Sequence, residues 1–237
     1  MKIEILYPQL CCLYGDKGNT MFLQQCLPDA EFIFTGLNEK PAFLSQEIDL
    51  CCMYSASEQN QELILGRMLE WKDEISEVCK SGKTLFLLLG NAMELFGTYI
   101  QREDESKIDG LGVFNTYTLR HAPKRFNTLI MSQFEGMDLL GYTSRFSDTF
   151  GISEDIAMSK VILGTGSDGK NNLEGIRCGR VIGTYMLGPL LVSNPDFTKW
   201  LFKELNINDY ELPFEEDLYK SYEVRRKEFQ RPDLVMD

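Results

Sequence analysis

The sequence predicts an α/β protein with a mostly parallel central sheet, flanking helices and added antiparallel strands. Two observations support this fold class. In the first half of the chain, short apolar segments alternate with segments of helical spacing, which is the pattern of βαβ units. In the second half, short strand-like segments are separated by Gly, Asn and Asp, which favours antiparallel or mixed additions to the sheet.

The first half of the chain contains the elements expected of the parallel sheet. After the loop LYGDKGN at 13–19, a helix is expected up to about Leu27. Residues 59–80 place apolar side chains at helical spacing, and Gly82 is a typical helix stop. The run 49–54 is continuously apolar, as in a strand that is covered on both faces. The four predicted strands are residues 2–7, 31–35, 49–54 and 84–89.

The second half is predicted to hold shorter strands and then helices. A helix is expected over 196–205, and another over 218–229 in the charged tail. We interpret residues 1–210 as one domain and 211–237 as a charged helical tail, packed on that domain or on a partner. The predicted strands are residues 111–119, 128–133, 139–143, 161–163 and 180–185.

Composition excludes several classes of function. The net charge of −12 repels nucleic acid and anionic membranes, so neither partner is expected. No apolar run reaches the roughly 18–20 residues that a membrane span needs, and no signal peptide is recognisable at the N-terminus. Seven cysteines without an export signal indicate free thiols in a reducing compartment, so we expect a cytoplasmic protein. With one histidine and no CxxC spacing, a zinc site would need thiolates from distant segments, so we expect no metal site. We also expect no cofactor.

The cysteines fall into two kinds of context. Cys51 and Cys52 lie inside an apolar run, where we expect them to be small buried core residues. Cys11 and Cys12 lie in a more loop-like segment, and their role stays open.

The carboxyl ends of parallel strands are where ligands bind in open α/β sheets. Loops at 13–19, 55–59 and 90–92 each follow a predicted strand, and a fourth loop, 183–191, follows a late strand. If these loops converge, the pocket is lined by Asp16, Asn19, Ser55, Ser57, Glu58, Asn91 and residues 186–188.

The loop at 90–92 resembles the strand–turn–helix segment on which many enzymes carry a nucleophile, but it lacks a nucleophilic side chain. The stretch LFLLLGNAMELFG reads as a buried strand that enters a tight turn and then a helix. Many α/β enzymes place a nucleophilic side chain at such a turn. Here the turn carries Gly90, Asn91 and Ala92, none of which is a nucleophile.

Five motifs together resemble class I glutamine amidotransferase domains of the cobyric acid synthase type, which have a flavodoxin-like fold. Among these, the chain is most similar to the glutaminase subunits of bacterial lipid II isoglutaminyl synthases, which act on peptidoglycan precursors. The most specific of the five motifs is the one nearest the C-terminus, which contains Gly-Thr-Tyr, Gly-Pro and Asn-Pro. The motifs are LYGDKGNTMFLQQ, DLCCMYSASEQNQ, LLLGNAMELFG, GLGVFNTYT and EGIRCGRVIGTYMLGPLLVSNPDFTKWL.

The resemblance implies that two catalytic positions are replaced. The family reads Cys-Gly-Gly-Tyr-Gln at the turn, and Gly90 stands in the place of its nucleophilic cysteine. It reads Gly-Thr-Tyr-Leu-His-Gly-Pro near the end, and Leu187 stands in the place of its histidine base. The segment 55–57, Ser-Ala-Ser, replaces the glycines of the oxyanion loop. Because amide hydrolysis of this type needs a nucleophile and an adjacent base, we expect intrinsic glutaminase activity to be absent.

Other site residues keep two interpretations. Asn91 could donate a hydrogen bond into the pocket, but we expect it to cap the following helix. Glu94 replaces the family's glutamine, and we expect it to interact with the N-terminal dipole of that helix. Arg125 falls where the resemblance implies an arginine that holds the carboxylate of glutamine. Asp16 and Asn19 match the family's first loop, as turn residues or as ligand contacts.

Three functions remain open on the sequence. The first is a pseudoenzyme that binds a Mur-ligase-like synthase subunit, with glutamine or a related small molecule as a possible ligand of the vestigial pocket. The second is an active amidotransferase in which other residues serve, such as Cys11, Cys12 or His121, or in which a partner supplies them. His121 itself is expected on a solvated basic turn. The third is a hydrolase that uses a pair of carboxylates. Whether the chain is an enzyme is therefore left undecided.

Overall fold

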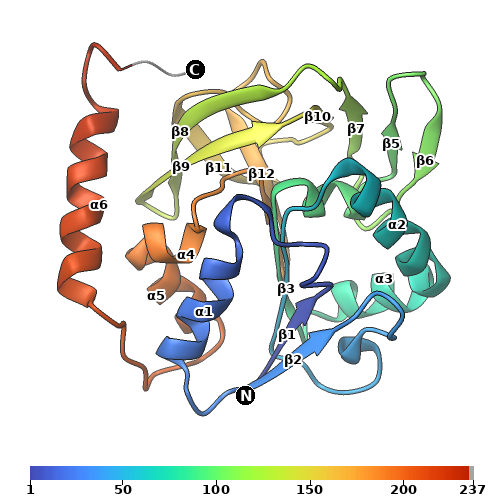
Figure 1. The fold of residues 1–237 in the computed structure, drawn as a ribbon, viewed down its shortest axis with the longest axis horizontal. Coiled ribbons are helices and arrows are strands. Elements are labelled where there is room, and N and C mark those ends of the chain that lie inside the picture. The colour runs from blue at the N-terminus through green and yellow to red at the C-terminus, as the bar shows by residue number, and fades with distance from the viewer. Residues whose placement is uncertain (235–237) are drawn as a thin grey trace.

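A nine-stranded mixed sheet forms the centre of the molecule in the computed structural model, which describes residues 1–234 (Figure 1). The strand order is β2-β1-β3-β4-β13-β12-β11-β8-β9. The first five strands are parallel to one another, and the pairs from β13–β12 onward are antiparallel, so the predicted fold class is confirmed. The parallel strands are β1 (Lys2–Leu6), β2 (Glu31–Thr35), β3 (Leu50–Met53), β4 (Leu85–Leu89) and β13 (Val181–Thr184).

The second half of the chain completes this sheet and builds a smaller one. The antiparallel strands of the main sheet are β8 (Phe126–Phe134), β9 (Met137–Arg145), β11 (Ala157–Leu163) and β12 (Leu173–Cys178). A separate four-stranded sheet has the order β10-β7-β5-β6. Its strands are β5 (Tyr99–Gln101), β6 (Lys107–Asp109), β7 (Tyr117–Arg120) and β10 (Ser147–Phe150).

Helices cover both faces of the parallel part of the main sheet (Figure 1). One face carries α2 and α3, and the other carries α1 together with the C-terminal helices α4 and α5. The α-helices are α1 (Lys17–Cys26), α2 (Glu58–Met68), α3 (Lys72–Ser81), α4 (Leu190–Ser193), α5 (Pro195–Glu204) and α6 (Glu215–Phe229). The 3₁₀ helices are η1 (Leu13–Gly15), η2 (Ala42–Leu44), η3 (Leu69–Trp71) and η4 (Gly90–Phe96).

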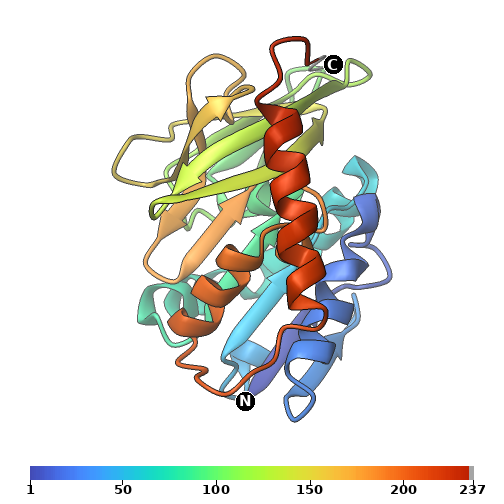
Figure 2. The ribbon, with the colours of Figure 1, turned by 90° about the vertical axis from the view of Figure 1, so that its left-hand side faces the viewer.

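The C-terminal helix α6 packs along one side of the main body, in contact with α4, α5 and β9 (Figure 2). The Tyr222 hydroxyl donates a hydrogen bond to the backbone oxygen of Asp138 (2.7 Å), and Arg226 pairs with the Asp138 carboxylate (3.1 Å). Residues 235–237 of the predicted tail lie outside the described residues.

Several predicted elements differ in extent from the structure, and two of them are wrong in a way that has a clear physical reason. The helix predicted over 59–80 is broken at η3, where Trp71 leaves helical geometry (φ −121°, ψ 23°), although Gly82 does end α3 in a left-handed conformation. The strand predicted over 111–119 forms only from Tyr117. Its first residues instead hydrogen-bond to η4: the Leu111 N–H donates to the Leu95 oxygen, and the Phe114 N–H donates to the Phe96 oxygen.

The core agrees with the apolar segments of the sequence. Strands β3 and β4 are buried along their whole length, and Cys51 and Cys52 are fully buried, as predicted. Among the described residues, the structure contains no helix with the length and apolar character required for a membrane span.

Candidate functional site

The turn after β4 is the structural centre of the candidate site. Gly90 follows the last residue of β4 and has φ +61°, a left-handed conformation that favours glycine. A Cβ atom on this residue would lie 2.1 Å from Ser55 Oγ and 3.4 Å from Leu187 Cδ2. The space that a side chain at residue 90 would occupy is therefore filled by the Ser55 hydroxyl, with Leu187 beside it.

Ser55 is positioned by the loop that precedes α1. Its backbone N–H donates a hydrogen bond to Asp16 Oδ2 (3.0 Å), and both residues are buried. Burial raises the pKa of the Asp16 carboxyl to about 6, against the lowering effect of that hydrogen bond. Ser55 Oγ and Asp16 Oδ1 are both buried, and neither has a hydrogen-bond partner among the described residues.

Asn91 joins the turn to the loop after β3. Its Oδ1 accepts a hydrogen bond from the Ala56 N–H (3.0 Å), and its Nδ2 donates to the Ala56 oxygen (2.8 Å). The prediction that Asn91 caps a helix is wrong, because the side chain is used in this reciprocal pair and the following segment is the 3₁₀ helix η4. The Ala56 N–H is consequently occupied by this hydrogen bond.

Glu94 lies beneath the turn in a buried hydrogen-bond network. Its carboxylate accepts hydrogen bonds from Gln61 Nε2 (2.7 Å), from the Tyr185 hydroxyl (2.7 Å) and from Ser147 Oγ. Burial raises the pKa of Glu94, whereas these hydrogen bonds lower it. The predicted dipole interaction is wrong, since the carboxylate binds side chains from α2, from β10 and from Tyr185, the residue that follows β13.

Strand β13 leads into the segment that carries Leu187. The side chain of Leu187 is buried, and its backbone pairs with Tyr142 of β9: the Leu187 N–H donates to the Tyr142 oxygen (2.8 Å). This pairing holds the Leu187 side chain against the turn at Gly90. The position that the resemblance assigns to a histidine is therefore filled by an apolar side chain.

The cavity at this position is very small. Its volume is ≈ 10 Å³, about the space that one water molecule requires. Of the predicted pocket residues, Ser55, Glu58 and Asn91 line it. The complete lining is Tyr14, Ser55, Ala56, Glu58, Gly90, Asn91, Ser144, Arg145, Phe146 and Ser147.

Arg125 lies at the rim of the cavity rather than in it. Its guanidinium donates to the hydroxyls of Tyr14 (3.2 Å) and Ser144 (3.4 Å) and stacks over the Phe146 ring (4.4 Å). The side chain is exposed, so a cation faces solvent beside the site. Arg145, by contrast, is buried and is held by Asp148 and by the backbone oxygens of Ser147 and Gly166.

Two of the predicted pocket residues have structural contacts elsewhere. Asn19 is buried and its Oδ1 accepts from the Leu191 N–H (2.9 Å), which ties α1 to α4. Ser57 caps α2 by accepting from the Asn60 N–H (3.3 Å).

The residues considered as substitute catalytic groups do not line the cavity. Cys11 is buried, and burial raises the pKa of its thiol to about 12, whereas Cys12 is exposed; both line a different groove beside α1. His121 is exposed and lies 3.3 Å from the Asp148 carboxylate, in keeping with the solvated turn that was predicted.

The sequence reasoning missed Tyr14 and residues 144–147. The latter form the turn between β9 and β10, and the register of distant strands brings this turn to the site. No local pattern in the sequence marks it as part of a site. Among the described residues, no group of three or more His, Cys, Asp and Glu side chains could hold a metal ion.

Comparison with known proteins identifies the family of this architecture. A family model described as a CobB/CobQ-like glutamine amidotransferase domain matches residues 2–195. The lipid II isoglutaminyl synthase (glutamine-hydrolyzing) subunit GatD of Streptococcus pneumoniae (strain ATCC BAA-255 / R6) is 25% identical over 226 residues, which cover 92% of this chain and 86% of that protein. The subunit of the same name from Staphylococcus aureus (strain N315) is 23% identical over 194 residues, 81% of this chain and 79% of that protein.

Solved structures show the same fold at lower identity. The structure of PurLQS from Thermotoga maritima superposes with a TM-score of 0.57 at 14% identity, covering 86% of this chain and 97% of that one. A glutamine amidotransferase structure gives the same TM-score and identity. The matched residues include β1 to β4, the turn at Gly90 and the segment that carries Leu187. The chain therefore belongs to the CobB/CobQ-like glutamine amidotransferase domain family.

Proposed function

We propose that this protein is a catalytically degenerate glutamine amidotransferase subunit that binds a Mur-ligase-like synthase in cell-wall precursor amidation. One observation supports the loss of catalysis above the others. The position of a side chain on Gly90 is occupied by Ser55 Oγ, 2.1 Å from the Cβ that a nucleophile there would have.

The chemistry of the site is consistent with this proposal. Amide hydrolysis by this family's route needs a nucleophile activated by an adjacent base, and losing either typically lowers the rate by about a millionfold. Gly90 has no side chain, and the Leu187 side chain cannot accept a proton. The cavity of ≈ 10 Å³ also leaves no room for the side-chain amide of glutamine beside the turn.

The proposed partner follows from the relatives. Both curated relatives are subunits of lipid II isoglutaminyl synthase, and this chain spans 86% and 79% of their lengths. We therefore propose a cytoplasmic scaffold whose domain is residues 1–210 and whose tail, 211–237, presents the outward face of α6 to solvent or to the partner. Seven free cysteines agree with a reducing compartment.

A second function is favoured by a different observation. Ser55 Oγ lies 2.1 Å from the Cβ position of residue 90, where the family's nucleophile would be attached. Asp16, whose pKa is raised to about 6, accepts a hydrogen bond from the Ser55 backbone N–H. A hydroxyl beside a carboxylate of raised pKa could replace the thiol and imidazole, provided that the cavity opens. The chain would then be an amidotransferase with residues that the family does not use.

Ammonia release from glutamine separates the two functions. The purified chain, its Ser55→Ala variant and an iodoacetamide-treated sample would be compared with the Streptococcus pneumoniae subunit as a positive control. We expect no glutamine-dependent ammonia from this chain in any arm. Release that alkylation abolishes would establish a thiol enzyme, and release that Ser55→Ala abolishes would establish the second function; either result overturns the proposal.

The partner is tested separately. Co-purification of the tagged chain from its native source, followed by mass spectrometry, is expected to recover a Mur-ligase-like protein in stoichiometric amount. Recovery of the chain without such a protein, under conditions in which the positive control retains its partner, contradicts the scaffold role.

A further inference from the structure

The two edges of the main sheet differ in how their backbone groups are satisfied. At the β9 edge, the outward-facing groups of alternate residues are paired. The Asp138 oxygen accepts from Tyr222, Leu140 exchanges two hydrogen bonds with the Asn194 side chain, and Tyr142 pairs with Leu187. This edge is therefore closed by α6 and by the segment around α4.

The opposite edge, β2, is open. The Glu31 N–H donates to the Met1 oxygen and the Thr35 oxygen accepts from the Tyr7 N–H, so these residues direct their backbone groups toward β1. Because strand residues alternate in direction, Phe32 and Phe34 direct theirs away from the sheet. No described strand lies beyond β2 (Figure 1).

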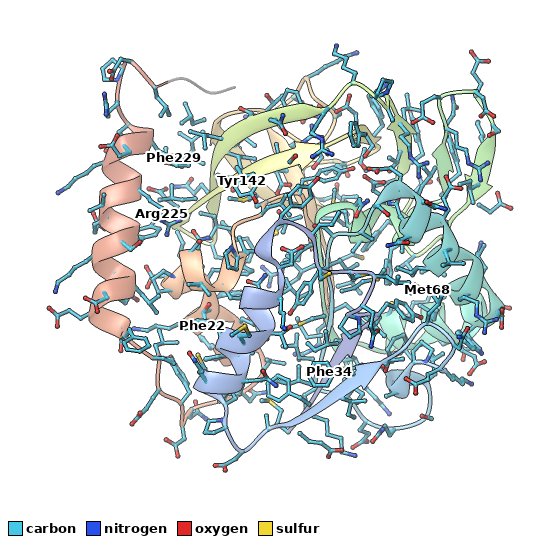
Figure 3. All side chains as sticks on the ribbon, in the orientation of Figure 1. Phe22, Phe34, Met68, Tyr142, Arg225 and Phe229 are labelled. Carbon is cyan, nitrogen blue, oxygen red and sulfur yellow. The ribbon has the colours of Figure 1, made fainter. Side chains whose placement is uncertain are left out.

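Strand β2 has few of the features that usually protect an edge, and its one charged residue is Glu31 at its first position. Its sequence, Glu-Phe-Ile-Phe-Thr, contains no Lys, Pro or Gly, and the strand carries no bulge against β1. Phe34 is 48% exposed and lies on the α1 side of the sheet, where Figure 3 shows it on β2. Beside it is a groove of ≈ 340 Å³ lined largely by apolar side chains, among them Met21, which is 52% exposed.

The sequence of β2 is close to a palindrome about Ile33. If two copies pair antiparallel with a two-fold axis at Ile33, Phe32 of each copy lies opposite Phe34 of the other, and Glu31 lies opposite Thr35. Each Phe32–Phe34 pair then exchanges two backbone hydrogen bonds, and its rings lie on the same face of the sheet. A self-complementary patch is what a two-fold interface requires.

We propose that β2 is a dimerisation edge, and that its occupant is the β2 strand of a second copy of this chain. The pairing would join the two main sheets into one continuous sheet, with the Phe34 rings beside the α1 grooves. Because paired strands run in opposite directions, the two Gly90 turns would lie at opposite ends of this sheet. Each would remain open to a synthase partner, so the dimer is independent of the function proposed above.

The test is the mass of the full-length protein in solution, measured by sedimentation over a wide concentration series. We expect a concentration-dependent shift from 27.2 kDa to twice that mass. Salt should strengthen association, because each copy carries a net charge of −12. A single species of 27.2 kDa at every concentration and salt level would overturn the proposal.

Two variants of Phe34 distinguish the contribution of its ring to dimerisation from that of its backbone hydrogen bonds. Phe34→Ala removes two symmetric aromatic pairs and should raise the dimer dissociation constant about tenfold. Phe34→Pro also removes an N–H that faces away from β1, so it should abolish dimerisation while the pairing with β1 survives. Ile162→Ala is the matched control, since Ile162 is 55% exposed on β11, which is paired on both sides.

Hydrogen exchange identifies the surface without any variant. In the concentrated sample, the amides of Phe32 and Phe34 should become protected, while that of Ile33 should not change. A dimer in which the amides of Phe32 and Phe34 exchange as in the monomer would place the interface elsewhere and overturn the proposal. This readout also holds if Phe34→Pro proves unstable.

Discussion

At the scale of single residues, Gly90 and Ser55 together exclude a side chain from position 90. Gly90 adopts a left-handed conformation that L side chains rarely accept, and Ser55 Oγ fills the position of its missing Cβ. Neither the left-handed conformation nor the position of Ser55 Oγ would by itself prevent a nucleophilic side chain at this position. A cysteine at residue 90 could adopt this φ at some cost, but it would then collide with Ser55.

Gly90→Ala should therefore destabilise the protein through two separable effects. The left-handed conformation costs about 1–2 kcal/mol, and the clash with Ser55 adds about 1–3 kcal/mol to the loss in free energy of unfolding. In a Ser55→Gly background, the second contribution should disappear. Urea unfolding of the four proteins in this cycle measures the coupling.

Gly15→Ala is the control for the first effect, because Gly15 has φ +79° and nothing lies within 4 Å of its Cβ position. The interpretation is wrong if Gly90→Ala costs no more than Gly15→Ala.

At the scale of elements, α6 is held by a small hydrophobic cluster that is separate from the main core. Tyr222 is the only buried residue of α6, and it packs with Met131 and Leu140 of the main sheet. Arg225 and Phe229 lie on the same side of the helix, toward the body of the molecule (Figure 3). The outer face is charged and contributes little to folding.

Tyr222→Ala should release α6 while the sheet stays folded. Removing a buried aromatic ring and its hydrogen bond to Asp138 should speed amide exchange in α6 by roughly 30- to 100-fold. Exchange in β4 should be unchanged. Val224→Ala, at a residue 62% exposed on the same helix, should leave α6 as protected as in the wild type. Equal effects of the two variants would show that α6 is not anchored by Tyr222.

At the scale of the whole molecule, buried carboxyls and net charge act in the same direction on pH stability. Burial raises the pKa values of Asp16 and Glu174 to about 6 each. A carboxyl with a raised folded-state pKa binds its proton more tightly in the folded protein. Its contribution to stability is complete below the unfolded pKa and is lost as pH rises through about 6. The negative self-repulsion of the chain also weakens as pH falls.

Asp16→Asn should therefore stabilise the protein at pH 8 and have little effect near pH 4. The gain at pH 8 should be about 3 kcal/mol at most, from a pKa that rises from 3.8 to about 6. Thermal or urea unfolding across this pH range measures it. The exposed Asp29 provides a control substitution, Asp29→Asn, for which we expect no pH-dependent gain. A gain that grows as pH falls would have the opposite sign and refute the assignment.

The parallel half of the fold could be predicted because each of its strands is a local apolar run. The predicted segments 31–35 and 84–89 agree with β2 and β4 to within a residue. The smaller sheet could not be predicted, since β5 and β6 are three residues each and β10 pairs with β7 from a distant part of the chain. For the same reason, Asn91 was expected to cap a helix, whereas its partner Ala56 is 35 residues away.

The amino-acid sequence by itself determined the family, the order of the parallel strands along the chain and the two residues, Gly90 and Leu187, that face each other at the turn. These are properties of local composition and motif. Only the tertiary structure decided that Ser55 occupies the space beside Gly90, that residues 144–147 close the cavity and that β2 is left open while β9 is covered. Such features depend on strand register and on contacts between distant segments, which no local pattern encodes.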